Sequence, residues 1–364
     1  MSSSSTSEKT IVLVTGATGY VGGSVLSRLL ALPYAEEKYE FRAIVRDAGK
    51  AQKLELGFGV KTIVGSHSDQ QLISKEAAEA DVVLAMADCD DLDAADGINK
   101  GLKERFEITG KRPILIHISG ADWAWNNVQT GVISDAAAGD YASDMIWDDE
   151  NVSQLDSIAP DAFHRPAELK VLSADEEGYA KTYIVCPTLI YNAARNPLVD
   201  VGISNSRTSL FKMLILMAVK RDFGVTIGKG ENLWANVHIG EVADFFVLLF
   251  NSALDNSKDL LHGREGYFFL GSDESKSVEF YSEISRILFN LGKIKSPTPT
   301  EVTEEEAVLF LGEGAGPLVR IMIGGNKRCV STRARKLGWK PQKNTERMLG
   351  TMKDEVDFCL GTLE

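Results

Sequence analysis

The feature that most constrains the fold is a glycine-rich turn near the N-terminus, with the sequence VTGATGYVGG at residues 14–23. It follows a run of β-branched residues at 10–16 and opens a stretch with helical character. Gly16 is expected to form the tight turn, Gly19 to let the backbone approach a pyrophosphate, and Gly22 to let helix and strand pack closely. The start of such a helix offers free N–H groups and a positive dipole end to phosphates. This strand–turn–helix context predicts a nucleotide-binding site.

Further apolar runs, separated by helical stretches, follow along the chain. They are rich in Val and Ile and do not alternate with polar residues, which is typical of strands buried on both faces of a parallel sheet. The expected strands lie at 40–47, 60–66, 81–88, 113–120 and 183–191. Regular alternation of strand and helix predicts an α/β fold of the Rossmann type, with a doubly wound parallel sheet.

The rest of the chain predicts a second, smaller domain. We expect a disordered tail at 1–9 and a Rossmann domain at 10–191 that is completed by about 226–270. Residues 192–225 and 271–364 then form a mainly helical substrate domain, because their strand signals are weak and their helical signals are strong.

The alternation of strands and helices breaks at 121–160, a segment rich in Gly, Asn and Asp. A loop of this length inside a compact domain is usually functional. Trp123, Trp125 and Trp147 either line a pocket for an apolar or aromatic substrate or anchor the loop by packing.

Composition excludes several kinds of partner. The formal net charge of −13 is expected to repel nucleic acid and acidic membranes. The four cysteines form no CxxC pair, which indicates reduced thiols and neither a disulfide framework nor a metal site. The apolar run LFKMLILMAVKR is too short to span a bilayer, and the N-terminus lacks the apolar core of a secretory signal. We therefore expect a cytoplasmic monomer or homodimer that acts on a small molecule.

The end of the second expected strand bears on the choice of cofactor. In this fold an acidic residue there holds the adenosine ribose of NAD, whereas a basic residue accommodates the 2′-phosphate of NADP. Arg46 stands at the strand end with Asp47 behind it, and Arg suits a bidentate phosphate contact. NADP is therefore favoured over NAD, with ribose binding by Asp47 as the alternative. Asp69, after the third strand, either meets the adenine or caps the next helix.

Five segments together resemble the extended short-chain dehydrogenase/reductase family. They are TGATGYVGG, ADVVLAMAD, ILIHISG, IVCPTLIY and IGKGENLWANVHIGEVADFFVLL, and the likeness covers most of residues 10–265. It is closest to the atypical branch, which includes the NAD-dependent epimerase/dehydratase-like and NmrA-like proteins. The resemblance implies a nicotinamide cofactor, a small-molecule substrate and a Rossmann domain interleaved with a smaller substrate domain.

The resemblance also assigns residues to the expected cofactor site. Thr18, Tyr20 and Val21 complete the phosphate-binding turn, and Ala87 and Asp88 flank the adenine ribose. Ser119 matches the catalytic Ser or Thr after the fifth strand. The segment that meets the nicotinamide carboxamide corresponds to Pro187, Thr188 and Leu189. His238 matches a motif histidine that is more often structural than catalytic, and Asn192 stands where the family often has Gly.

The chain departs from the family at its Tyr-x-x-x-Lys pair, which donates the proton during hydride transfer. Tyr34 and Lys38 have this spacing, but they follow the first helix and so lie at the wrong edge of the sheet. Counting back from the strand at 183–191 places His164 at the Lys position and Pro160 near the Tyr position.

Three interpretations of this departure stay open. In the first, His164 and Arg165 take over the role of the Tyr-x-x-x-Lys pair, and a residue of the loop at 121–160 supplies the acid. The candidate acids in that loop are Tyr141, Asp122 and Asp144. Alternatively, the protein binds NADP without turnover and acts as a redox sensor. In the third interpretation, the cofactor is retained for non-redox isomerisation or cyclisation. The sequence HRP at 164–166 is also compatible with a plain helix start, with Pro166 in the first turn and Arg165 on the surface.

Overall fold

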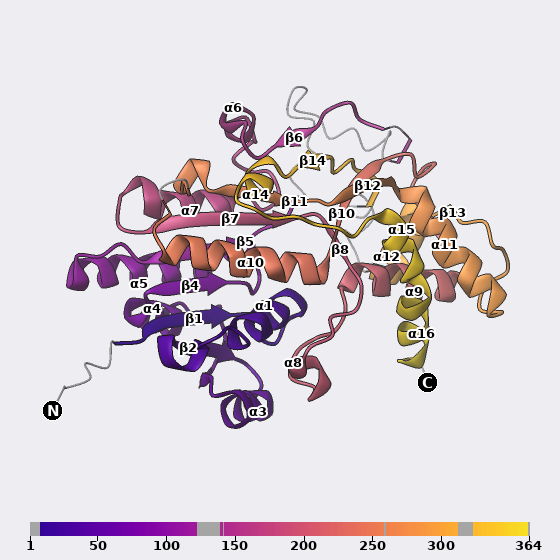
Figure 1. Ribbon diagram of the computed structural model, residues 1–364. Coiled ribbons are helices and arrows are strands. Elements are labelled where there is room, and N and C mark those ends of the chain that lie inside the picture. The colour runs from indigo at the N-terminus through magenta and orange to yellow at the C-terminus, as the bar shows by residue number, and fades with distance from the viewer. Residues whose placement is uncertain (1–7, 122–138, 141, 258–259, 312–322, 363–364) are drawn as a thin grey trace.

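The chain folds around one large sheet and one smaller helical region (Figure 1). The structure is a computed structural model and describes residues 8–121, 139–140, 142–257, 260–311 and 323–362.

The large sheet has seven parallel strands in the order β11-β7-β5-β4-β1-β2-β3. Its strands are β1 (Thr10–Thr15), β2 (Tyr39–Val45), β3 (Lys61–Val64), β4 (Val82–Ala85), β5 (Ile114–Ile118), β7 (Lys181–Pro187) and β11 (Tyr267–Leu270). The strand order reverses between β1 and β4, where the ends of the two strands diverge and ligands bind in such sheets. The expected doubly wound Rossmann fold is confirmed.

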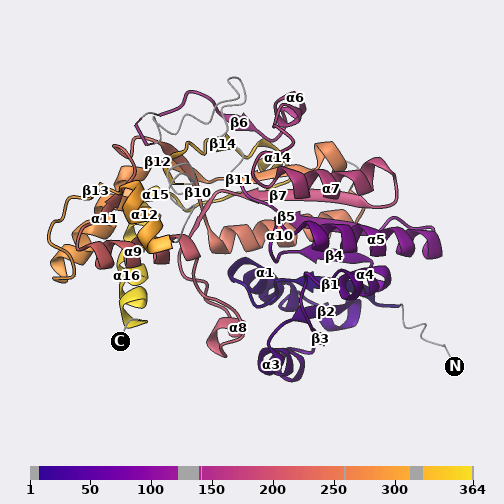
Figure 2. The same cartoon turned by 180° about the vertical axis from the view of Figure 1, so that it is seen from behind.

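Helices cover both faces of this sheet, as the two opposite views show (Figures 1 and 2). One face carries α1 (Tyr20–Leu30) and α10 (Ile239–Leu254), and the other carries α4 (Gln70–Glu79), α5 (Leu92–Thr109) and α7 (Arg165–Glu176). Val12 and Val14 pack into the first apolar layer, whereas Leu13 between them packs into the second. Alternate residues of one strand thus serve two cores, which explains why the strands read as continuous apolar runs.

The expected strand at 183–191 is wrong in one respect, because it is two strands in two sheets. After Pro187 the chain leaves the large sheet, and β8 (Leu189–Tyr191) pairs with β10 (Leu233–His238). β10 in turn pairs antiparallel with β12 (Asp273–Lys276). The backbone N–H and the hydroxyl of Thr188 both donate to the carbonyl of Leu270, at 3.1 and 2.9 Å, and hold the crossing point.

The smaller region contains α9 (Ser209–Arg221), α11 (Ser277–Asn290), α12 (Glu304–Leu311), α15 (Thr345–Gly350) and α16 (Met352–Gly361). They pack around a third apolar core that includes Phe211, Trp234 and Phe280. A short connection, α8 (Pro197–Asp200), lies between β8 and α9, and β9 (Val225–Thr226) pairs with β13 (Thr300–Glu301). Within the described residues, every helix is too short or too polar to cross a lipid bilayer.

The segment before α7 is joined to the C-terminal part of the chain. β6 (Trp147–Asp148) pairs with β14 (Cys329–Val330), and α6 (Val152–Asp156) follows β6. Trp147 is buried in the apolar layer beside Cys186 and Phe269 and therefore anchors this segment by packing. Asp149 is also fully buried, and its carboxylate accepts hydrogen bonds from the backbone N–H groups of Phe269 and Arg333. Trp123 and Trp125 lie outside the described residues.

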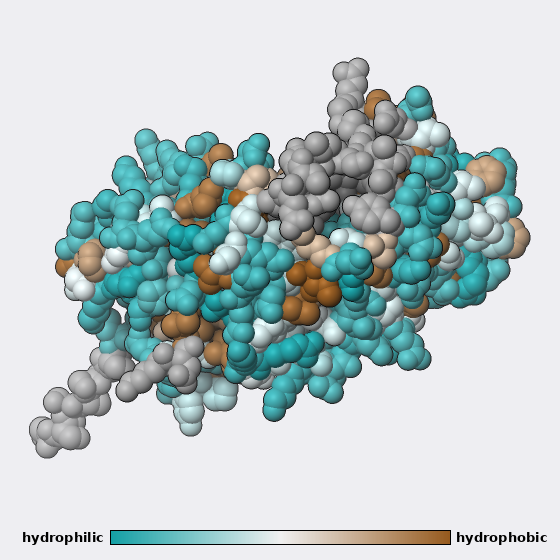
Figure 3. Space-filling view, turned by 90° about the horizontal axis from the view of Figure 1, so that it is seen from above, coloured by the Kyte–Doolittle hydropathy of each residue, from teal (hydrophilic) through white to brown (hydrophobic). Residues whose placement is uncertain are grey.

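The space-filling view from above shows a surface that is mostly hydrophilic (Figure 3). Hydrophobic side chains appear there in small separate groups between polar ones. Scattered apolar residues of this kind are ordinary on a protein surface.

Candidate functional site

The glycine turn has the geometry that a phosphate-binding loop needs. Gly16 has φ +70°, and a Cβ there would lie 2.1 Å from the carbonyl oxygen of Met86. A Cβ on Gly22 would lie 2.2 Å from the carbonyl oxygen of Gly16, so helix α1 approaches the turn closely. Gly19 is the N-cap residue of α1, and its Cβ would meet only the Gly16 carbonyl, at 3.1 Å. The open side of Gly19 at a helix N-terminus fits a pyrophosphate, and a side chain would fill it.

The smaller region holds this turn in place. The Tyr20 hydroxyl donates to the carbonyl of Asn192, and the Asn205 N–H donates to the carbonyl of Thr18 at 3.0 Å. Asn192 has φ +77°, a conformation that Asn tolerates better than most residues, which explains how it stands where the family often has Gly. Val21 packs against the first apolar layer. The turn is therefore clamped between the sheet and the chain that leaves it.

The end of β2 presents one cation and one occupied carboxylate. Arg46 is exposed, whereas the Asp47 carboxylate accepts a hydrogen bond of 2.9 Å from the N–H of Lys50 and caps α3 (Ala48–Phe58). A guanidinium exposed at this strand end suits a phosphate on the adenosine ribose. The capping bond leaves Asp47 fewer acceptor positions for ribose hydroxyls.

Asp69 takes the second of its two expected roles, because its carboxylate caps α4. It accepts hydrogen bonds from the N–H groups of Gln71 and Leu72, at 3.1 and 3.0 Å. A cap role does not exclude contact with the adenine, so that assignment remains a prediction.

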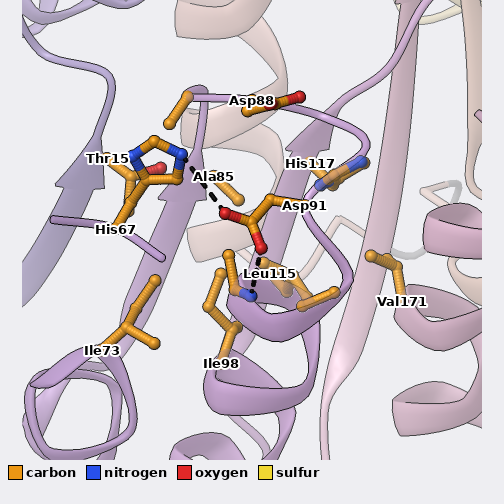
Figure 4. A pocket seen from close by; sticks show the side chains of 13 residues that line it. Thr15, His67, Ile73, Ala85, Asp88, Asp91, Ile98, Leu115, His117 and Val171 are labelled. Atoms are coloured by element: carbon orange, nitrogen blue, oxygen red, sulfur yellow. Dashed lines mark hydrogen bonds and ion pairs between the residues drawn. The ribbon is translucent and has the colours of Figure 1, made fainter. Parts of the chain in front are cut away.

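A small cavity of about 20 Å³ opens where β1, β4 and β5 end (Figure 4). Ala87 and Asp88 line it together with His67 and Asp91, and the Asp91 carboxylate lies 3.5 Å from His67 Nε2 and accepts a bond from Ser68. These residues surround the edge where the resemblance places the adenosine ribose. His67 and Asp91 were missed at the sequence level, because both sit in polar turns that look like ordinary helix starts.

His117 forms one wall of the same cavity, beneath the loop from β4 to α5 (Figure 4). Its side chain is buried, and in the part of the chain that the structure describes its Nε2 has no hydrogen-bond partner. Burial lowers the pKa of His117 to about 4, with the nearby His164 as a further cause. The imidazole is therefore neutral near pH 7.

His164 stands at the start of α7 in a strained position, with φ +67°. Its side chain is buried, and Nδ1 lies 2.8 Å from Oδ1 of Asp90 and 3.5 Å from Sγ of Cys89. Asp90 and Cys89 belong to the loop after β4, so the start of α7 meets the edge of the sheet at which Ala87 and Asp88 lie. A non-Gly residue held at positive φ often marks a functional position.

Ser119 and Arg165 belong to a buried polar network that sequence reasoning missed. The Ser119 hydroxyl donates to Oε1 of Glu168 at 2.7 Å, and Glu168 is fully buried. Arg165 Nη1 lies 3.3 Å from Oε2 of the same carboxylate and 2.5 Å from the hydroxyl of Tyr267. Burial raises the pKa of Tyr267 well above its ordinary value, and the Glu168 carboxylate adds to this. Tyr267 is therefore a neutral structural partner.

The remaining predicted residues occupy different places. Pro187, Thr188 and Leu189 lie at the crossing between the two sheets, where Thr188 is partly exposed and Pro187 and Leu189 are buried. Pro166 stands in the first turn of α7, and Arg165 is buried beside it, so the alternative of a surface arginine is wrong. Asp144 is exposed. Asp122 and Tyr141 lie outside the described residues.

His238 has the structural role that the sequence favours. Its Nδ1 accepts a hydrogen bond of 2.9 Å from the N–H of Gly240 and caps α10, while Nε2 lies 3.0 Å from the side-chain amide of Asn192. Burial lowers the pKa of His238 to about 4, so the ring is neutral and Nδ1 can accept. His238 thereby links α10 to the residue that holds Tyr20.

The chain matches a protein-family model, a related sequence and the folds of solved structures. Residues 8–103 match the model of the NmrA-like family. The chain is 27% identical over 344 residues to Oxidase ucsJ of Acremonium sp, and the match covers 91% of this chain and 92% of that protein. The fold matches UDP-glucose 4-epimerase of Thermotoga maritima with a TM-score of 0.61 and 15% identity, over 97% of this chain and 100% of the other. It also matches dTDP-glucose 4,6-dehydratase of Bacillus anthracis in complex with NAD, with a TM-score of 0.60 and 14% identity, over 96% and 97% of the two chains.

These matches confirm the resemblance to the atypical extended short-chain dehydrogenase/reductases. The whole chain has the fold of the UDP-glucose 4-epimerase and the dTDP-glucose 4,6-dehydratase. The N-terminal part, at 8–103, carries the NmrA-like pattern.

Proposed function

We propose that the chain is an NADP-preferring oxidoreductase that acts on a small carbonyl or alcohol substrate without a Tyr-x-x-x-Lys pair. The observation that carries this proposal is the geometry of the turn formed by Gly16, Gly19 and Gly22, here called the glycine cradle. Gly16 and Gly22 have no room for a side chain, whereas a Cβ on Gly19 would meet only the Gly16 carbonyl, at 3.1 Å. The exposed Arg46 at the end of β2 supports NADP over NAD. The name of the relative Oxidase ucsJ and the NAD bound to the B. anthracis dehydratase support redox chemistry with a nicotinamide.

A bound nicotinamide supplies or accepts the hydride, and the chain must then supply or accept a proton. We assign this proton to His164, because its imidazole stands at the start of α7 beside the loop after β4. Asp90 accepts from Nδ1–H of His164 and so fixes the tautomer and the ring orientation. Ser119 and Arg165 support the site indirectly, since their side chains bond to Glu168. Tyr141 remains a proposed donor from the loop.

The substrate is proposed to be small and fairly apolar or aromatic, and the protein to be a cytoplasmic monomer or homodimer. The partly exposed Thr188 at the crossing between the sheets lies where the two regions of the molecule meet. Substrate sites occur preferentially at such junctions and at the switch point of the sheet.

A catalytically silent NADP-binding module is the second candidate function. The observation that favours it is the occupation of Ser119 and Arg165 in the network around Glu168. Two of the groups expected to act on substrate are thereby tied to a buried carboxylate. A module of this kind needs the same glycine cradle but no proton donor.

A substrate screen with matched variants separates the two functions. NADPH oxidation is followed with a panel of aromatic and aliphatic ketones and aldehydes, and NADP⁺ reduction with the corresponding alcohols. With an active substrate, His164→Ala is expected to lower kcat at least about a hundredfold, the usual contribution of a positioned acid–base group.

The control is His262→Ala, because His262 Nδ1 also meets a carboxylate, Asp175 at 2.7 Å, but at the opposite end of α7. This variant is expected to keep its turnover. Turnover that survives both His164→Ala and Ser119→Ala would refute the catalytic assignment. NADPH binding with no turnover in the whole panel would favour the silent module.

A further inference from the structure

We propose that the loop after β4 and the start of α7 form a binding site for one divalent transition metal of the Zn²⁺ type. The ligands are the thiolate of Cys89, a carboxylate oxygen of Asp90 and Nδ1 of His164. The site goes beyond the proposed hydride transfer and shares His164 and Asp90 with it. Metal binding is measured without turnover, so its failure is distinguishable from failure of the proposed function.

The three donor atoms already lie together, all within 4.8 Å of one another. Tetrahedral Zn²⁺ with ordinary bond lengths separates sulfur from nitrogen by about 3.5 Å and nitrogen from oxygen by about 3.3 Å. The Cys89 Sγ to His164 Nδ1 distance is 3.5 Å, and the Asp90 Oδ1 to His164 Nδ1 distance is 2.8 Å. The sulfur is therefore placed for coordination, and the carboxylate has to withdraw by about half an ångström.

The chemistry of this donor set favours Zn²⁺ over Mg²⁺ or Ca²⁺. Thiolate and imidazole are ligands of borderline and soft metals, whereas the hard cations take oxygen ligands almost alone. Binding forms a metal–sulfur bond and releases the thiol proton of Cys89 to solvent. Nδ1 of His164 turns from donor to ligand, and the proton that it carried moves to Nε2 of the same neutral ring. The Asp90 side chain is 41% exposed, which gives the metal a path of entry.

His117 supplies an independent observation for a ligand at this place. Its Nε2 is buried and has no hydrogen-bond partner among the described residues, which costs free energy for a polar atom unless a bound ligand satisfies it. The ring lies beneath the loop that carries Cys89 and Asp90, and it interacts electrostatically with both Asp90 and His164. We assign Nε2 of His117 to hydrogen bonding with a water in the fourth coordination position, the usual arrangement of a three-ligand zinc site.

The site escaped the sequence because its ligands come from two distant segments. Cys89 and Asp90 are 75 and 74 residues from His164. Spacing rules for zinc detect only pairs that are close along the chain.

The test is metal titration of the full-length protein after removal of metal with a chelator. Zn²⁺ is titrated in competition with a chromophoric chelator, and Co²⁺ is titrated separately to detect thiolate-to-cobalt charge transfer in the near ultraviolet. We expect one equivalent of metal and a charge-transfer band. Cys89→Ser is expected to remove the band, and His164→Gln to weaken binding at least tenfold. His117→Gln is expected to keep the band and weaken binding severalfold.

Cys329→Ser is the matched control, because Cys329 is also partly exposed but lies outside the cluster. It is expected to bind metal as the unchanged protein does. Should Cys89→Ser fold poorly, alkylation of the unchanged protein with iodoacetamide replaces it, with each thiol followed by mass spectrometry. Zn²⁺ is then expected to protect Cys89 selectively. Less than about half an equivalent of bound metal, a band that persists in Cys89→Ser, or protection of Cys329 in place of Cys89 overturns the proposal.

Discussion

Substitution of Gly19 by alanine should separate cofactor binding from folding. Gly19 has φ −78° and ψ 174°, backbone angles that alanine adopts readily, and its Cβ would meet only one atom, at 3.1 Å. The loss in unfolding free energy is expected to be about 1 kcal/mol or less, the range for alanine at an N-cap. The added methyl group, however, stands where the pyrophosphate must approach. NADPH affinity is expected to fall at least about tenfold, or ~1.4 kcal/mol.

Alanine substitutions at two other glycines serve as controls for Gly19→Ala. Gly16→Ala places a side chain at φ +70° and 2.1 Å from the Met86 carbonyl. Left-handed backbone alone costs about 1–2 kcal/mol, and the overlap adds to it, so a loss of stability of more than about 3 kcal/mol is expected. Gly57→Ala lies within α3 with nothing near its Cβ, and it should stabilise the protein by up to about 1 kcal/mol without changing NADPH binding.

The assay combines urea unfolding with NADPH fluorescence on the same preparations. Gly19→Ala should keep the unfolding midpoint close to that of the unchanged protein and lose NADPH affinity. Gly57→Ala should keep the affinity, with an unfolding midpoint equal to or above that of the unchanged protein. If Gly19→Ala bound NADPH with unchanged affinity, the pyrophosphate would not lie over this glycine, and the reasoning from the cradle would be wrong.

Two further predictions concern buried carboxylates. Glu168→Gln removes the charged partner of the buried Arg165 and should lower the unfolding free energy by about 3–5 kcal/mol in urea titrations. The double variant Arg165→Met/Glu168→Met leaves no unpaired charge and should lose less unfolding free energy than the single variant. An equal or larger loss in the double variant would contradict the role of the ion pair. Burial raises the pKa of Asp149 to about 7, from 3.8, so the folded state holds this proton more tightly. The free energy of unfolding should therefore fall by an amount on the order of 4 kcal/mol, through Asp149 alone, as pH rises from about 4 to about 7. In Asp149→Asn, the free energy of unfolding should depend less on pH over this range, as urea titrations at several pH values would measure. An unchanged pH dependence would refute the assignment.

The features that could be predicted from the sequence depend on short stretches of chain. The glycine turn sets its own geometry, since Gly16 and Gly22 act on atoms within the turn and at the end of β4. The continuous apolar runs predict buried parallel strands, because each strand serves two apolar layers. The division of 183–191 into two strands was not predictable, because both halves are equally apolar and the break depends on Thr188 bonding to Leu270.

The parts of the candidate site that could not be predicted depend on distant pairs. Asp90 meets His164 across 74 residues, and Tyr267 meets Glu168 across 99. Glu168 lies in the sequence AELK at 167–170, which is typical of the polar face of a helix. Its side chain is nevertheless fully buried. Sequence patterns detect which face of a helix is apolar, but they do not reveal a buried carboxylate whose cost is offset by an arginine from the same helix turn.

The central claim is that the chain binds NADP through the glycine turn and Arg46. Fluorescence titrations of the purified protein with NADPH and with NADH test it most directly, with Arg46→Ala and, as a control from α3, Lys53→Ala. A charged hydrogen bond contributes about 1.5–3 kcal/mol, so NADPH should bind at least about tenfold more tightly than NADH. That preference should disappear in Arg46→Ala and persist in Lys53→Ala. Equal binding of the two nucleotides would contradict the role of Arg46, and binding of neither would contradict the claim as a whole.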